Sequence, residues 1–109
     1  MEKDFQIVKL SDKREVKVTE LTGLDEMIAM NVTGKELDNS SAGIMQYRYV
    51  LMCFSIVEID GKKIERPKNL TEVRAFMAQF KIKDTTRIST AYYSLNTDAG
   101  EQPAVESEN

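Results

Sequence analysis

The feature that most constrains this chain is an apolar run in its middle, YRYVLMCFSIVEIDGKKI, at residues 47–64. The longest uncharged part of the run, from Tyr49 to Val57, is about half of the roughly 20 residues that a bilayer-spanning helix needs. A membrane span is therefore not expected. A run this apolar has to be covered by other elements of the same fold or by another protein.

Helical spacing explains most of the run. Over residues 42–57, apolar side chains recur at Ile44, Tyr47, Leu51 and Phe54, which follow the i, i+3, i+7, i+10 pattern of a helix. Further apolar residues widen this stripe until the helix is apolar nearly all round. Such a helix is normally covered on several sides, so the sequence predicts a buried central helix.

One hairpin is predicted before this helix and a second one after it. FQIVKL (5–10) and EVKVTEL (15–21) both approach the alternation of half-buried strands, and the polar turn SDKR joins them. After the apolar run, Asp60 and Gly61 form a strong turn signal, which predicts a second hairpin or a strand that joins the first sheet. Because an isolated hairpin is marginally stable in water, the strands must pack against helices.

Further helices are predicted from capping residues and apolar spacing. The first follows Thr22 as its N-cap, has an apolar stripe of Leu24, Met27, Ile28 and Val32 that is expected to turn inward, and ends at Gly34. The same reasoning gives a cap at Asn39, Ser40 or Ser41 for the central helix, and Asn69 as the cap of a third helix with Leu70, Val73, Phe76, Met77 and Phe80 inward. It also gives a charged break at residues 81–84 and a last helix from Thr85 or Thr86 with Ile88, Ala91, Tyr92 and Leu95 inward.

These elements predict an α+β fold, with a small N-terminal β-hairpin and a second short hairpin packed with about four α-helices around one core. The length of 109 residues suits one domain, which we place at residues 1–96. Residues 97–109 are predicted to be a disordered acidic tail, because they lack periodicity and carry four acidic groups without Lys or Arg. The first 96 residues hold 15 basic and 14 acidic groups, so nucleic-acid binding is not expected.

The residue types that usually carry catalysis are scarce. There is no histidine, and the single cysteine, Cys53, lies in the apolar segment LMCFS, where we expect a core residue. No metal or cofactor is expected, since no recognisable ligand set or phosphate-binding loop is present. The lone cysteine fits a reducing compartment, and MEKDFQIVKL has no secretory signal pattern, so a cytoplasmic location is predicted. An enzyme is not expected.

Several side chains are candidates for protein contact. The helices carry more apolar surface than a small chain easily hides, which predicts self-association or a protein partner. Tyr92 and Tyr93 lie about 100° apart around a helix, so one of them is expected to be exposed. The internal methionines could belong to the core or to an adaptable contact surface: Met27, Met30, Met45, Met52 and Met77. A basic group could contact phosphates or an acidic partner, or could protect an exposed strand edge: Lys62, Lys63, Arg66 and Lys68.

Two short motifs, TELTGLDE (19–26) and SIVEIDGKKI (55–64), resemble the tail assembly chaperones of long-tailed bacteriophages and prophages. The resemblance covers residues 5–95. It implies a non-enzymatic protein of the host bacterial cytoplasm that coats the aggregation-prone tape-measure protein, hands it to polymerising tail-tube protein, and is absent from the finished tail. Many members of this family also have a longer product made by ribosomal frameshifting.

For a chaperone of this kind, the partner-binding residues are expected among the aromatic side chains of the last two helices, unless these simply form the core: Phe76, Phe80, Tyr92 and Tyr93. Two other classes stay open. A structural component of a phage tail or baseplate would persist in purified virions. A small DNA-binding regulator would need a basic recognition helix, yet this region offers Arg74 and Arg87, besides Lys81 and Lys83.

Overall fold

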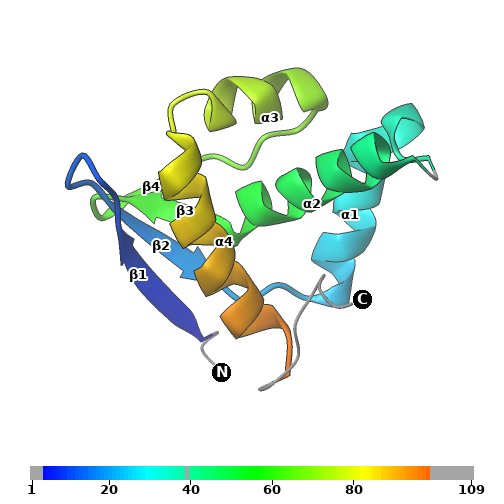
Figure 1. Cartoon of the computed structure of the whole chain (residues 1–109). Helices are drawn as coiled ribbons and strands as arrows, with labels where there is room; N and C mark the ends of the chain where they lie inside the picture. Colours follow the sequence, from blue (N-terminus) through cyan, green and yellow to red (C-terminus); the bar gives the residue numbers. More distant parts are fainter. Residues whose placement is uncertain (1–3, 39, 99–109) are drawn as a thin grey trace.

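The computed structural model describes residues 4–38 and 40–98 and shows an antiparallel sheet packed against helices. The predicted α+β class, with two hairpins and four α-helices, is confirmed. The elements are β1 (Phe5–Lys9), β2 (Glu15–Thr19), α1 (Gly23–Thr33), the 3-10 turn η1 (Gly34–Glu36), α2 (Ser41–Ser55), β3 (Ile56–Ile59), β4 (Lys62–Lys63), α3 (Leu70–Met77) and α4 (Ile82–Asn96). Figure 1 shows the sheet on the left, α1 and α2 on the right, and α4 between them.

The four strands lie in the order β1-β2-β3-β4, so the second hairpin joins the first sheet through β2 and β3. Val16 and Val18 of β2 are fully buried. Val16 pairs with Ile59 and Val18 with Ile56, with a shift in register between them that marks a bulge. The alternating pattern of β2 therefore turns its valines towards the core that the sheet shares with α4.

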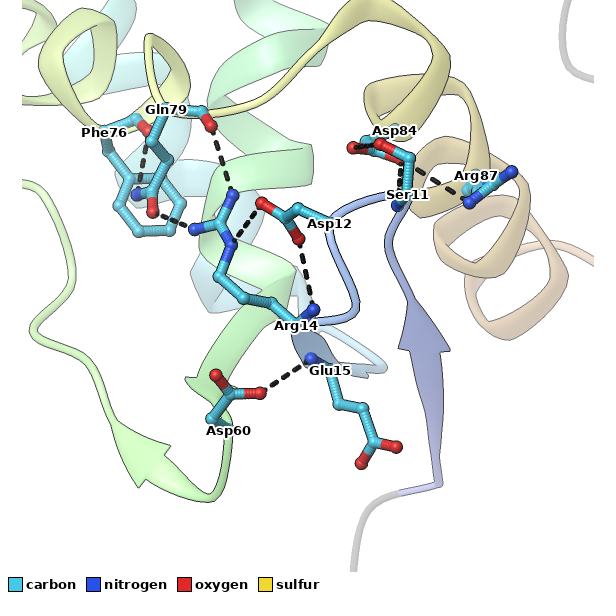
Figure 2. A network of polar contacts seen from close by, with 9 residues as sticks. All are labelled: Ser11, Asp12, Arg14, Glu15, Asp60, Phe76, Gln79, Asp84 and Arg87. Atoms are coloured by element: carbon cyan, nitrogen blue, oxygen red, sulfur yellow. Dashed lines mark hydrogen bonds and ion pairs between the residues drawn. The ribbon is translucent and has the colours of Figure 1, made fainter.

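The Asp60-Gly61 turn between β3 and β4 was predicted correctly. Both residues have positive φ, 53° at Asp60 and 78° at Gly61, which suits the twist of a two-residue hairpin. Asp60 also contacts the neighbouring strand, since its Oδ1 accepts a hydrogen bond of 2.8 Å from the Glu15 N–H. This turn is therefore fastened to β2 as well as to its own hairpin (Figure 2).

The central helix α2 is buried in its C-terminal half, and Gly43 is the one buried residue of its first half. Ser40 caps it by accepting a hydrogen bond from the Gly43 N–H. From Val50 to its end every side chain is buried, but Ile44, Met45 and Tyr49 are 40% to 57% exposed. The prediction of a helix covered all round to about residue 57 is thus wrong for its first half, and the chain becomes strand at residue 56.

The core consists of two clusters joined by shared side chains. One lies between the sheet and α4 and includes Leu10, Val16, Ile56 and Ile88. The other lies among α1, α2 and α3 and includes Phe54. The side chains that pack against both clusters are Phe76, Met77 and Tyr92.

Helix α1 is oriented differently from the prediction for three of the four residues of its apolar stripe, while the fourth, Val32, packs against the second cluster. Leu24 and Met27 are each 64% exposed and Ile28 is 36% exposed, although the sequence places them inward. The residues that α1 buries instead are Asp25, Ala29 and Thr33.

A polar contact explains this orientation. The Asp25 carboxylate accepts a hydrogen bond from the Thr22 N–H and pairs with the Arg66 guanidinium at 3.0 Å. Arg66 in turn lies over the Phe54 ring of α2, 4.2 Å from its centroid. Burial raises the pKa of Asp25. The hydrogen bonds from Thr22 and Arg66 lower it by more than burial raises it, so the pKa lies below its usual value. Small Ala29 then allows close packing in the second cluster.

Helix α4 begins at Ile82, a turn earlier than predicted, because a distant contact fixes its first turn. Asp84 accepts hydrogen bonds from the Ser11 N–H at 2.9 Å and the Ser11 hydroxyl at 2.8 Å, and Arg87 lies 3.6 Å away (Figure 2). Burial raises the pKa of Asp84, but these hydrogen bonds and the charge of Arg87 hold it below the usual value. Residues 81–84, which were predicted to be a charged break, therefore form the start of α4 and fix it to the turn after β1.

Most of the predicted acidic tail, from residue 99, lies outside the described residues, as does Asn39. Thr97 closes α4 by donating from its N–H to the Tyr93 carbonyl oxygen at 3.0 Å. Over residues 4–38 and 40–98, no helix has the length and apolarity to cross a membrane.

Candidate binding surfaces

Cys53 has the properties of a core residue. Its side chain is 1% exposed, and burial raises the pKa of its thiol to about 12. The thiol is therefore protonated at neutral pH and is a poor nucleophile. Within the described part of the chain, no group of three or more His, Cys, Asp or Glu residues could hold a metal ion. The described residues also form surfaces that are candidates for protein contact.

A groove of about 260 Å³ lies between α2 and α4. Helix α2 contributes Met45, Tyr49 and Met52 to one wall, with Arg48 among them. Helix α4 contributes Thr85, Thr86, Ser89, Thr90, Tyr92 and Tyr93 to the other. The groove thus has a flexible apolar wall facing a wall of hydroxyl-bearing residues.

The threonines of α4 are less polar in this groove than their side chains imply. The hydroxyl groups of Thr85 and Thr86 both donate to the Ile82 carbonyl oxygen, and that of Thr90 donates to the Thr86 carbonyl oxygen. Each hydroxyl hydrogen is therefore used within the helix. The apolar wall of α2 and these threonines can receive apolar side chains, while Arg48 and Ser89 place further polar groups in the same groove.

Tyr92 and Tyr93, two of the predicted partner-binding residues, both line this groove. Their rings meet edge to face, with centroids 5.1 Å apart, a favoured aromatic geometry. Both are half-buried, so the prediction that one of them is exposed is wrong. Burial raises the pKa of Tyr92 to about 12, and its hydroxyl is neutral at physiological pH.

Phe76 and Phe80, the other two predicted residues, lie away from the groove. Their rings are also edge to face, 5.4 Å apart. Phe80 is 9% exposed, and the Arg14 guanidinium of the β1–β2 turn lies 5.2 Å from its ring centroid. The structure therefore separates the four predicted residues into a groove pair and a core pair, and a partner role for them stays a prediction.

The basic residues near the second hairpin do not form a single patch. Lys62 and Lys63 are exposed on β4, at the edge of the sheet, where lysine discourages pairing with another strand. Arg66 instead pairs with Asp25 and covers Phe54. The charge of Arg66 is thus paired within the fold, where it fixes α1 through Asp25.

Six of the exposed large apolar side chains among the described residues lie on α1 and the first turns of α2, two helices that pack together (Figure 1). Sequence reasoning missed this surface because it turned the α1 stripe inward. Its three methionines, Met27, Met30 and Met45, were among those for which the sequence left an adaptable contact surface open. We name it the α1–α2 face and define it by Leu24, Met27, Ile28, Met30, Ile44 and Met45, which are 36% to 64% exposed. Met45 also lines the groove, so the two surfaces adjoin.

Comparison of the chain with protein-family models, curated proteins and solved structures gives no match. A functional assignment therefore rests on these surfaces and on the two sequence motifs.

Proposed function

We propose that this protein is a non-enzymatic tail assembly chaperone of a phage or prophage. It binds the tape-measure protein in the host cytoplasm and releases it to the growing tail tube. The observation that carries the proposal is the α1–α2 face, where six large apolar side chains of one small chain are 36% to 64% exposed. A concentration of exposed apolar side chains on two helices that pack together is typical of a site that contacts another protein.

The side chains of the face suit a reversible contact. Met27, Met30 and Met45 have flexible, polarisable side chains that adapt to irregular partner surfaces. The adjoining groove can receive apolar side chains of the client beside Tyr92 and Tyr93, whose rigid rings make effective anchors. Such a surface shields aggregation-prone helices without a catalytic group.

The two motifs support the proposal through the fold. In TELTGLDE, Thr22 and Asp25 form the capping box of α1. In SIVEIDGKKI, Asp60 and Gly61 form the turn between β3 and β4. Because these residues have structural roles, what they support is a common architecture with the chaperone family, and the binding role depends on the exposed face.

The test is co-expression of the full chain with segments of the tape-measure protein, followed by size-exclusion chromatography at low and high salt. We expect co-elution that keeps the segment soluble and persists at high salt, because apolar contacts are not screened. The double variant Leu24→Ser/Met27→Ser should lose the complex. Its matched control is Ile82→Ser, which changes a side chain that is 85% exposed on α4, outside the face.

Precipitation of every tape-measure segment while the protein elutes alone would overturn the proposal. Detection of the protein in purified virions would then favour the structural-component alternative. Equal loss of the complex in Ile82→Ser and in the double variant would remove the face from the proposal.

A further inference from the structure

The charges around the α1–α2 face are unevenly divided. Residues 20–49 contain two basic residues, Lys35 and Arg48, and five acidic ones, whereas the rest of the described chain contains twelve basic and nine acidic residues. The acidic residues of this segment are Glu20, Asp25, Glu26, Glu36 and Asp38.

Most of this negative charge is available to a partner. Asp25 is committed to Arg66, but Glu26, Glu36 and Asp38 are exposed. They belong to α1, to η1 and to the loop before α2, the elements that carry or border the face. Lys35 and Arg48 are exposed as well, so the three acidic and two basic exposed residues of this segment give a net charge of −1 beside the apolar side chains, and we call these charged residues the acidic rim.

We propose that the α1–α2 face binds an amphipathic helix whose apolar stripe is flanked by Lys and Arg. This inference rests on the proposed function, since it names the chemistry of the client segment. An amphipathic helix places an apolar side chain on one side every three or four residues. Leu24, Met27 and Ile28 present a stripe with the same spacing along α1, and basic flanks of the client would meet the acidic rim.

The rim also argues against a second copy as the occupant. A two-fold symmetric contact places the same patch of each copy against the other. Glu26 and Glu36 of one copy would then face the acidic rim of the next, and like charges at an interface disfavour association. A heterologous basic partner meets no such repulsion.

The experiment compares two synthetic helical peptides of about 20 residues, a length of about 30 Å, by fluorescence anisotropy with the full chain. Both carry leucine at the same positions, but one carries lysine and the other glutamate on the polar side. We expect the lysine peptide to bind at least about tenfold more tightly at low salt. The preference should shrink as salt screens the rim.

Two sets of variants locate the effect. Glu26→Gln/Glu36→Gln should weaken binding of the lysine peptide about three- to tenfold. Glutamine keeps an oxygen near Tyr47, the side chain that Glu26 contacts. The control Glu15→Gln/Glu65→Gln removes the same charge from exposed residues outside the face and should leave binding unchanged. Leu24→Ser/Met27→Ser should weaken both peptides.

Equal affinity for the two peptides, or equal effects of the two glutamine pairs, would overturn the inference. So would sedimentation of the protein as a dimer that Leu24→Ser/Met27→Ser dissociates, since the face would then hold a second copy. If tape-measure segments bind without any preference for lysine, the proposed function stands and this inference fails. A clear lysine preference without tape-measure binding supports this inference and contradicts the proposed function.

Discussion

Aspartate at Leu51 and at Leu24, introduced separately, tests how the two neighbouring helices are oriented. Leu51 is 9% exposed within the cluster that α1, α2 and α3 share. Its replacement loses about 1.5–3 kcal/mol of apolar burial and places a carboxyl group in the core at a further cost of roughly 2–7 kcal/mol. The sum is comparable with the total stability of about 5–15 kcal/mol expected of a domain. We expect Leu51→Asp to be unfolded.

Leu24 should behave in the opposite way. It is 64% exposed and lies in the first turn of α1, just after the Thr22 cap. A carboxylate there gains about 0.3–1 kcal/mol from the helix dipole, which repulsion from Asp25 and Glu26 offsets. We expect the free energy of unfolding to change by less than about 0.5 kcal/mol.

Urea unfolding followed by far-ultraviolet circular dichroism measures both variants. A Leu24→Asp protein that loses more than about 2 kcal/mol, a loss typical of buried sites, would refute the outward orientation of α1. A folded Leu51→Asp protein that had merely lost its partner would refute the buried position of Leu51 in α2.

Three further predictions concern single sites. Gly43→Ala should lower stability by about 1–3 kcal/mol in urea unfolding, because the new Cβ would lie 2.5 Å from Asp38 Oδ1 and from a backbone oxygen of η1. Cys53, with a thiol pKa of about 12, should react with a thiol reagent in urea but hardly at all in the native state. The pKa of Asp84 is lowered in the folded state from 3.8. The ionised carboxylate therefore contributes fully to the free energy of unfolding above pH 3.8, and this contribution is lost as the pH falls below that value towards the pKa of the folded state. Urea midpoints of wild type and Asp84→Asn should therefore converge below about pH 4.

Local signals in the sequence were enough to find the element boundaries that depend on neighbouring residues. Thr22 and Asn69 cap α1 and α3 by accepting hydrogen bonds from backbone N–H groups three residues ahead. Gly34, with φ of 58°, ends α1 as predicted. These interactions span a few residues, so a short stretch of sequence contains both partners.

The features that sequence reasoning missed depend on distant partners. The orientation of α1 follows from the Asp25–Arg66 pair, and the start of α4 follows from the contact between Asp84 and Ser11. No periodicity within either helix contains this information.

The candidate surfaces show the same limit. Aromatic residues are favoured both in cores and at interfaces. Residue type therefore could not separate Phe80, which is buried in the core, from Tyr93, which lines the groove. The α1–α2 face was hidden from the sequence because an amphipathic stripe normally points inward.

The hydrogen bonds between the first hairpin and α4 also suggest an order of folding. Gln6 bonds to Ser94 across 88 residues, and Ser11 bonds to Asp84 across 73. Residues this far apart in sequence can form a contact only after the chain between them has lost the entropy of loop closure, so such contacts slow folding. Helices α1 and α2 are close in sequence, so we expect them to pair early and α4 to dock last. We expect the α1–α2 face to exist before the groove does, so that a nascent chain acquires its apolar face first.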